Sequence, residues 1–152
     1  MFKKVLKFIG IFLLGFVLLF VVLAIWLSIT SSKHTEKATP YLNKNIPLIS
    51  KWDFEKLRPL LTQPALEQFE TEQGQKIFKF FSKLGEAKSF EEPKFVNSKS
   101  SVTTTEGAKE MVIFNMGGHF ENGYATFTIT LESDDYEYKI QHLKINSDVF
   151  IE

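Results

Sequence analysis

The chain of 152 residues contains no cysteine, which excludes a disulfide scaffold, a thiolate metal site, a catalytic thiol and a lipid-modified cysteine. An excess of one charge is also lacking, because 18 basic and 18 acidic residues cancel, so nothing favours nucleic acid as a partner. The three histidines show no spacing typical of metal ligands, and there is no phosphate loop, dinucleotide fingerprint or nucleophile elbow. We therefore expect a protein that is not an enzyme, with no catalytic residue, cofactor or metal.

The chain does contain one long uncharged run, from Phe8 to Ile29. As a helix, these 22 residues would span about 33 Å, and a bilayer has a hydrocarbon core of roughly 30 Å. Leu14 and Phe20 lie within the run, and Trp26 lies near its end, where a headgroup region suits an indole. The run predicts a transmembrane anchor. A cleaved signal peptide is the alternative, but its apolar core is usually only about 7 to 15 residues long.

Three lysines, Lys3, Lys4 and Lys7, precede the run. By the positive-inside rule they predict a cytoplasmic N-terminus, which places the rest of the chain, with a net charge of −3, on the other side of the membrane. We divide the chain into a basic N-terminus with its anchor (residues 1–30), a polar stalk (31–39) and one α+β domain (40–152). Within the stalk, His34 is expected to be solvated.

Helical spacing of apolar residues begins the domain, and Pro47 and Pro59 are expected to break it into short pieces. Ser50 and Asp53 resemble a capping box. The strongest helix signal runs over residues 64–84, with Thr62 as N-cap, Gly85 as terminator and Gly74 as a point of bending or division. Its expected buried stripe comprises Leu66, Phe69, Ile77, Phe80, Phe81 and Leu84.

After Gly85 the apolar period changes to two, which predicts antiparallel strands over residues 87–96, 101–105, 108–116, 120–131 and 136–147. Ala125 to Leu131 alternate strictly, and the parity change between Ile140 and Leu143 predicts a β-bulge. Two dipeptides compete for the central hairpin turn, Gly117-Gly118 and Asn122-Gly123. We favour the second, because it leaves one long strand that contains both other glycines.

The step from Phe120 to Ala125, the alternating strand after it and the Tyr138-Lys139-Ile140 sequence resemble the cystatin-like and nuclear-transport-factor-two-like domains of many bacterial envelope proteins. Leu84-Gly85 before the first strand fits too, and the resemblance covers about Trp52 to Phe150. It implies short helices packed on a curved antiparallel sheet. Together with the predicted anchor and its orientation, it implies a single-pass protein of the bacterial inner (cytoplasmic) membrane with a periplasmic domain.

Enzymes with this cone-like fold place a carboxylate, His or Tyr in a pocket between helix and sheet, and the polar candidates here are His119, Tyr124, His142, Asp134, Asp135 and Asp148. The possible pocket or sheet-face residues are Phe81, His119, Phe120, Tyr124, Phe127, Tyr138 and His142. Sixteen phenylalanines are explained more simply by an aromatic core than by a ligand pocket. No constellation for catalysis is visible.

Two functions follow as expectations. The first is a membrane-anchored, non-catalytic binding module that serves as an accessory subunit or assembly factor of a membrane complex, with the bilayer and a protein as partners. The second is a small-molecule or lipid-binding domain with an apolar pocket between helix and sheet. A filled interior would favour the first, and an open pocket lined by phenylalanine would favour the second.

Overall fold

A computed structural model of the chain describes residues 2–103, 107–133 and 137–151, with side chains for 12–25, 34–100, 109–133 and 137–151. The chain divides into two compact units, Met1–Lys33 and His34–Glu152. Within the part of the chain that is described, no helix is both long enough and apolar enough to cross a membrane. The side chains of several residues named above lie outside the described set: Lys3, Lys4, Lys7, Phe8, Trp26, Ile29, Asp134 and Asp135.

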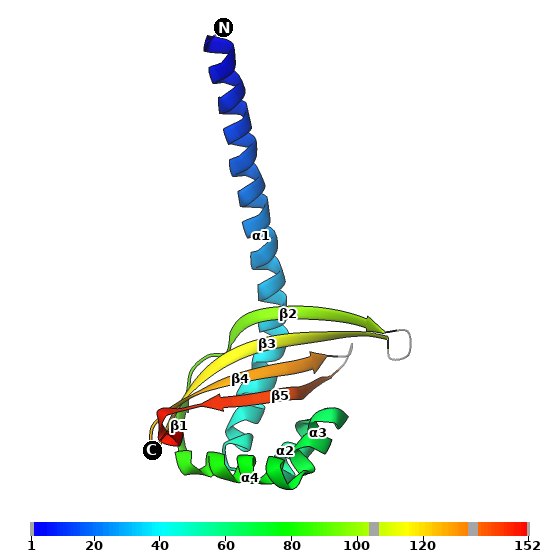
Figure 1. Cartoon of the computed structure of the whole chain (residues 1–152), viewed down its shortest axis with the longest axis vertical. Helices are drawn as coiled ribbons and strands as arrows, with labels where there is room; N and C mark the ends of the chain where they lie inside the picture. The colour runs from blue at the N-terminus through cyan, green and yellow to red at the C-terminus, as the bar shows by residue number, and fades with distance from the viewer. Residues whose placement is uncertain (1, 104–106, 134–136, 152) are drawn as a thin grey trace. The chain divides into compact units, whose positions relative to one another are not determined.

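The α-helices come first in the sequence, and the strands follow them (Figure 1). The helices are α1 (Phe2–Ile49), α2 (Phe54–Leu57), α3 (Gln63–Glu70) and α4 (Glu72–Phe81), with 3-10 turns η1 (Arg58–Leu60), η2 (Ser82–Leu84) and η3 (Asp148–Phe150). The strands are β1 (Ala87–Phe90), β2 (Lys94–Thr103), β3 (Gly107–Phe120), β4 (Tyr124–Ser133) and β5 (Tyr138–Asn146). This confirms the predicted α+β class.

The strands form one curved antiparallel sheet in the order β1-β3-β4-β5, and β2 pairs with the other half of β3 (Figure 1). β3 ends at Phe120 and β4 starts at Tyr124, so the hairpin turns near Asn122 and not at Gly117-Gly118. Phe120 N donates to Gly123 O at 2.8 Å, so the two turn residues are Glu121 and Asn122, one position before the predicted Asn122-Gly123. The register shifts between Thr130 and Leu131, opposite the predicted bulge in β5. The expected strand 87–96 was wrong, because the edge is interrupted between β1 and β2, where Pro93 cannot donate a backbone hydrogen bond.

Helix α1 does not stop at Pro47 as expected but ends at Ile49. An internal proline costs a helix about 3 kcal/mol, whereas burial of one Leu or Ile side chain stabilises the fold by about 1.5–3 kcal/mol. The residues on one face of this part of α1 have no exposed surface, so packing outweighs the lost hydrogen bonds. These residues are Ala38, Leu42, Ile46 and Ile49. The capping-box prediction was also wrong: Asp53 caps α2 by itself, and the Ser50 hydroxyl donates to Ile46 O at 2.9 Å.

The predicted helix over residues 64–84 is divided, but at Thr71 rather than at Gly74. The Thr71 hydroxyl accepts a hydrogen bond from Gly74 N at 3.0 Å and starts α4. This new start rotates the buried face, so Phe78 is buried while Ile77 and Phe80 are 46% and 40% exposed, contrary to the predicted stripe. The N-cap at Thr62 and the stop at Gly85, whose φ is +77°, are confirmed.

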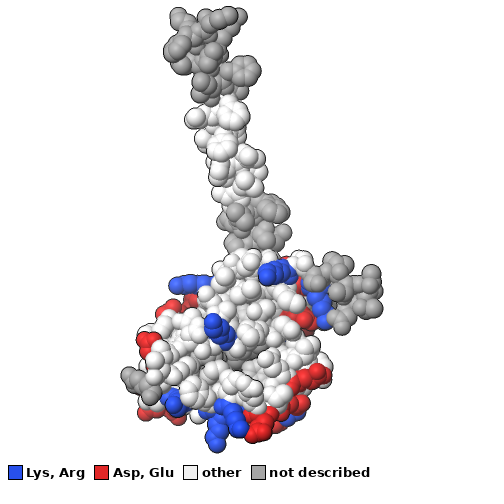
Figure 2. Space-filling view, in the orientation of Figure 1, with Lys and Arg blue, Asp and Glu red and all other residues white. Residues whose placement is uncertain are grey.

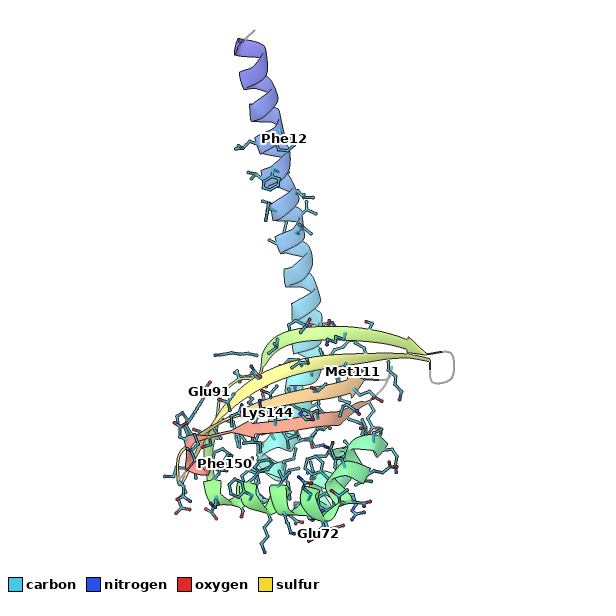
Figure 3. The ribbon with its side chains drawn as sticks, viewed as in Figure 1. Phe12, Glu72, Glu91, Met111, Lys144 and Phe150 are labelled. Carbon is cyan, nitrogen blue, oxygen red and sulfur yellow. The ribbon has the colours of Figure 1, made fainter. Side chains whose placement is uncertain are left out.

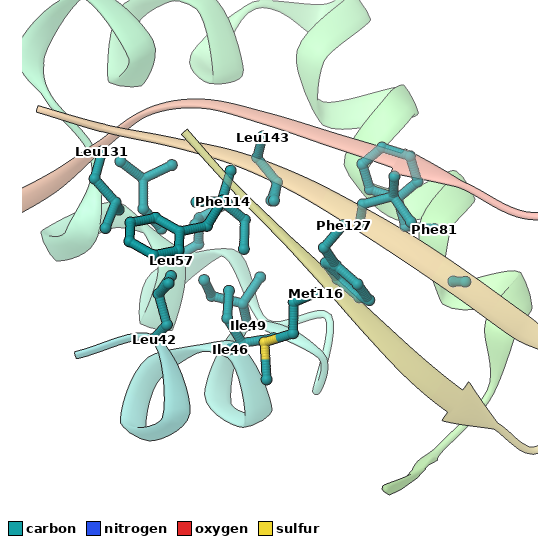
Figure 4. Close-up of a cluster of buried hydrophobic side chains, with 14 of the residues drawn as sticks. Leu42, Ile46, Ile49, Leu57, Phe81, Phe114, Met116, Phe127, Leu131 and Leu143 are labelled. Atoms are coloured by element: carbon teal, nitrogen blue, oxygen red, sulfur yellow. The ribbon is translucent and has the colours of Figure 1, made fainter. Parts of the chain in front are cut away.

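The core lies between the helices and one face of the sheet (Figure 4). Along β4, Ala125, Phe127, Ile129 and Leu131 have no exposed surface, as their alternation predicts. The buried residues of α1, α2 and α4 pack against this face in a single hydrophobic cluster. The opposite face carries Met111, Ile113 and the threonines of β4, and no described helix covers it. This uncovered surface is called the outer face below.

Candidate functional site

His119 and Tyr124 are the only pair of the predicted polar candidates that the described structure brings into direct ring contact. They are opposite each other on β3 and β4, with ring centroids 5.0 Å apart on the outer face. The Tyr124 hydroxyl donates to Glu91 Oε1 at 3.1 Å and lies over Gly117, where a Cβ atom would collide with it. Glu91 holds its place because its N–H donates to Gly117 O at 2.9 Å.

The aromatic ring of Tyr124 is therefore held from two sides while 44% of the residue stays exposed. Its pKa is raised, first by desolvation and then by the hydrogen bond to Glu91, so the hydroxyl remains protonated at neutral pH. A surface groove of about 430 Å³ adjoins it. Its walls are Asn122, Gly123, Tyr124, Thr126, Asn146, Ser147, Asp148 and Val149. Such a rigid, half-exposed aromatic beside polar groups is suited to contact with a partner molecule.

The remaining candidates do not join this group. The core contains Phe81, Phe120 and Phe127. The rings of Phe120 and Phe127 stack with their centroids 5.9 Å apart. His142 is exposed and opposite Thr130, six residues along β4 from Tyr124, or about 20 Å at the usual rise of a strand. Among the described residues, no group of three or more His, Asp or Glu side chains could hold a metal ion.

Figure 3 separates the two ends of the sheet: Glu91 and Phe150 lie towards one end, and Met111 lies towards the other. His34 is at the Met111 end, and it is not solvated as expected. Its Nε2 lies 3.3 Å from Glu110 Oε1, its ring stacks on Phe95 at 5.5 Å, and its side chain is only 14% exposed. The segment expected to be a polar stalk is part of helix α1. The contact of His34 with Glu110 was not predicted, because Glu110 is distant in the chain.

Tyr138 meets Tyr41 of α1 with ring centroids 5.8 Å apart. Burial, followed by the charge of Glu137, raises the pKa of Tyr41 to about 12. Burial also raises the pKa of Tyr138, with a smaller contribution from Glu110. The buried Tyr41 hydroxyl has no hydrogen-bond partner among the described residues. Tyr41 lies among the helically spaced apolar residues that begin the domain, and nothing near it in the sequence marks its hydroxyl as unsatisfied.

Tyr41→Phe is expected to raise the free energy of unfolding by about 1 kcal/mol at pH 7, because the variant no longer buries an unsatisfied hydroxyl. The folded-state pKa of Tyr41 is above the ordinary value of 10.0, so between pH 10 and 12 the unfolded chain loses this proton more readily than the folded protein. Ionisation of Tyr41 therefore leaves the free energy of unfolding of the wild type unchanged below pH 10 and lowers it as the pH rises towards 12. The advantage of the variant should therefore grow over that window. Urea unfolding at a series of pH values measures it.

Tyr124→Phe is the control for this experiment, because its hydroxyl is exposed and hydrogen-bonded to Glu91. We expect this variant to lose up to about 1 kcal/mol at pH 7. A Tyr41→Phe protein that is less stable than the wild type at pH 7 would show that its hydroxyl has a partner after all.

Comparisons with family models, curated proteins and solved structures give no match. The resemblance to cystatin-like and nuclear-transport-factor-two-like domains therefore stays a prediction from the residues that carry it. The observed geometry combines an open outer face, a held aromatic at one end of it and a hydrophobic interior. An exposed site of this kind is surrounded by water, which weakens the electrostatic stabilisation on which most enzymes depend.

Proposed function

We propose that the chain is a single-pass, membrane-anchored binding module that acts without catalysis as an accessory subunit or assembly factor of a bacterial inner-membrane complex. The observation that carries the proposal is the apolar part of α1. From Phe12 to Ile25 every described side chain is exposed, with Phe12 at 75% and Leu14 at 66%. A helix with apolar residues on all sides is stable where lipid surrounds it.

Charge supports the orientation of the anchor. The 22-residue run of the sequence extends on both sides of the described residues 12–25, and Lys3, Lys4 and Lys7 precede it. The proposal places these lysines in the cytoplasm and the unit His34–Glu152 on the extracytoplasmic side. On the visible face of this unit, basic and acidic side chains are mixed (Figure 2), a pattern that suits a protein partner better than a nucleic acid.

The filled interior supports binding at the surface over a lipid-binding pocket. Phe114 and Phe127, the largest fully buried side chains, have no exposed surface. Phe120 packs on Phe127 and also on Trp52 at 5.9 Å, so the phenylalanines contact one another instead of lining a space. A ligand pocket between helix and sheet would need these rings to move apart, which the dense packing of protein interiors opposes.

A topology experiment tests the proposal. We expect a C-terminal reporter that matures only outside the cytoplasm to be active, and one that works only inside to be silent. The full-length protein should sediment with membranes and resist alkaline extraction, and Leu14→Asp combined with Phe20→Asp should release it. Leu14→Val combined with Phe20→Leu is the matched control and should stay bound.

Purification in mild detergent tests the accessory role. We expect a defined membrane complex to co-purify with the wild type in fixed stoichiometry and to be lost with the double aspartate variant. Activity of the inside reporter would refute the proposed orientation. A wild-type protein that runs alone and contains a bound lipid would favour the pocket function instead.

A further inference from the structure

One edge of the sheet has a groove beside it. β1 lies at this edge, and the last turn of α1 forms the opposite wall of a groove of about 460 Å³. The groove is lined by Pro47, Ser50, Lys51, Glu86, Ala87, Lys88 and Phe90. A groove between an edge strand and a helix has the shape of a site that accepts an extended peptide as an additional strand.

Backbone groups of β1 are available for such pairing. In the described part of the chain β1 pairs with β3 alone. Ser89 is opposite His119, and Glu91 N donates to Gly117 O at 2.9 Å, so the backbone of both residues points towards β3. Alternation then turns the N–H and C=O of Phe90 to the groove. Lys88 lies at the bulge between Ala87 and Ser89, and it has no partner in the register with β3.

This edge is also rigid, which lowers the entropic cost of binding. The Phe90 side chain is anchored in the core, with its ring 5.8 Å from that of Phe120 and 6.1 Å from that of Phe127. Trp52 Nε1 donates to Gly85 O at 3.2 Å and ties the end of α1 to the start of β1. Both walls of the groove are therefore held in place before a partner arrives.

Charge indicates which segment would fit. Lys51 and Lys88 are exposed on the two walls, and the ion pairs of the described residues include neither of them. Glu86 is the single acidic residue in the lining, so the groove has a net positive charge. We propose that the groove between β1 and the end of α1 binds an extended, acidic segment of a partner protein by β-strand addition. This inference rests on the proposed function, since it names the surface by which the module holds its partner.

A second copy of the chain is a weaker occupant. β1 has only four residues, so few of its backbone groups face outward. Pairing of two such strands would form few hydrogen bonds and would leave the α1 wall uncovered. A longer segment of a different protein can pair with β1 and contact Lys51 at the same time.

The test uses the full-length, isotope-labelled protein in detergent micelles, titrated with the peptide acetyl-Glu-Val-Thr-Val-Thr-Val-Glu-amide. We expect the amide resonances of Lys88 and Phe90 to shift and their hydrogen exchange to slow. A twin peptide in which every Val and Thr amide is N-methylated cannot donate to β1 from either edge and should bind about tenfold more weakly. A twin with lysine in place of glutamate should also bind more weakly.

Charge reversal on the protein completes the test. Lys51→Glu and Lys88→Glu should each weaken binding of the acidic peptide several-fold, up to about tenfold, at low salt. Lys79→Glu is the matched control, because Lys79 is exposed on α4 and lines a different groove. It should leave the affinity unchanged.

Four outcomes would overturn the inference: no binding of the acidic peptide, shifts confined to other surfaces, equal affinity of the N-methylated twin, or dimerisation of the free protein through β1. The peptide experiment needs no membrane. If the chain is anchored in the membrane and co-purifies with a complex but does not bind the peptide, this inference is refuted and the proposed function is not. A chain that binds the peptide but is not in the membrane refutes the proposed function.

Discussion

Trp52→Ala is expected to lower the free energy of unfolding by about 3 kcal/mol, because this half-buried indole joins three parts of the core. Its ring lies 6.3 Å from that of Phe78, 6.2 Å from that of Phe81 and 5.9 Å from that of Phe120. The variant also removes the donor that satisfies Gly85 O. Equilibrium unfolding in urea, monitored through the loss of secondary structure, measures the change in the free energy of unfolding.

Trp52→Gly should be less damaging than Trp52→Ala, by about 1 kcal/mol. Trp52 has a φ of +57° and is the only described non-glycine residue with a positive φ. It follows the end of α1, where its N–H donates to Ile49 O at 2.9 Å. A side chain in this left-handed conformation costs roughly 1–2 kcal/mol, and glycine avoids that cost.

Phe78 provides the control for this comparison. It lies inside α4 with helical geometry, so Phe78→Gly should be less stable than Phe78→Ala by about 1 kcal/mol. The order of the two substitutions is thus expected to reverse between positions 52 and 78. If the Gly variant were less stable than the Ala variant at both positions, the left-handed backbone at Trp52 would not lower the stability of the protein.

Gly74→Ala is expected to destabilise the protein by about 1–3 kcal/mol, although alanine is the better helix former by about 1 kcal/mol. A Cβ atom at Gly74 would collide with the backbone carbonyl of Gln68 and would lie 2.8 Å from Phe69 Cα. Both neighbours are backbone atoms, which cannot move aside as the end of a side chain can. α3 and α4 would have to separate at Thr71.

Gln73→Ala is the matched control, since Gln73 is exposed on the same helix and its change should stay within about 0.5 kcal/mol. Thermal and urea unfolding of both variants against the wild type give the comparison. A Gly74→Ala protein that is more stable than the wild type would mean that α3 and α4 do not approach this closely in solution.

Little of the candidate site could be predicted from the sequence. His119 and Tyr124 were both singled out, but their contact depends on a turn at Glu121-Asn122, one residue before the predicted one, because the exact turn decides which residues of a hairpin are opposite each other. Glu91 was missed, since it is 33 positions from Tyr124 and nothing near it marks it. The groove beside β1 was missed for the same reason: its walls come from α1 and β1, which only the tertiary structure brings together.

The sequence by itself determined the features whose chemistry is local. Alternation along β4, the bulge in β5 and the N-cap at Thr62 each depend on a few adjacent residues, and each was predicted. The turn before β4 was predicted to within one residue. The uncharged run beginning at Phe8 is equally plain. Hydrogen bonding and steric limits within one turn or one strand specify such features without help from the rest of the chain.

Only the tertiary structure decided features in which a local preference competes with burial. α1 continues through Pro47 because its apolar face is covered by the sheet, and α4 is turned so that Phe78 packs in the core while Phe80 is exposed. Local preferences of about 1–3 kcal/mol per residue were outweighed by the burial of several side chains at once. Residues distant in the chain supply that burial, so no window of the sequence contains the answer.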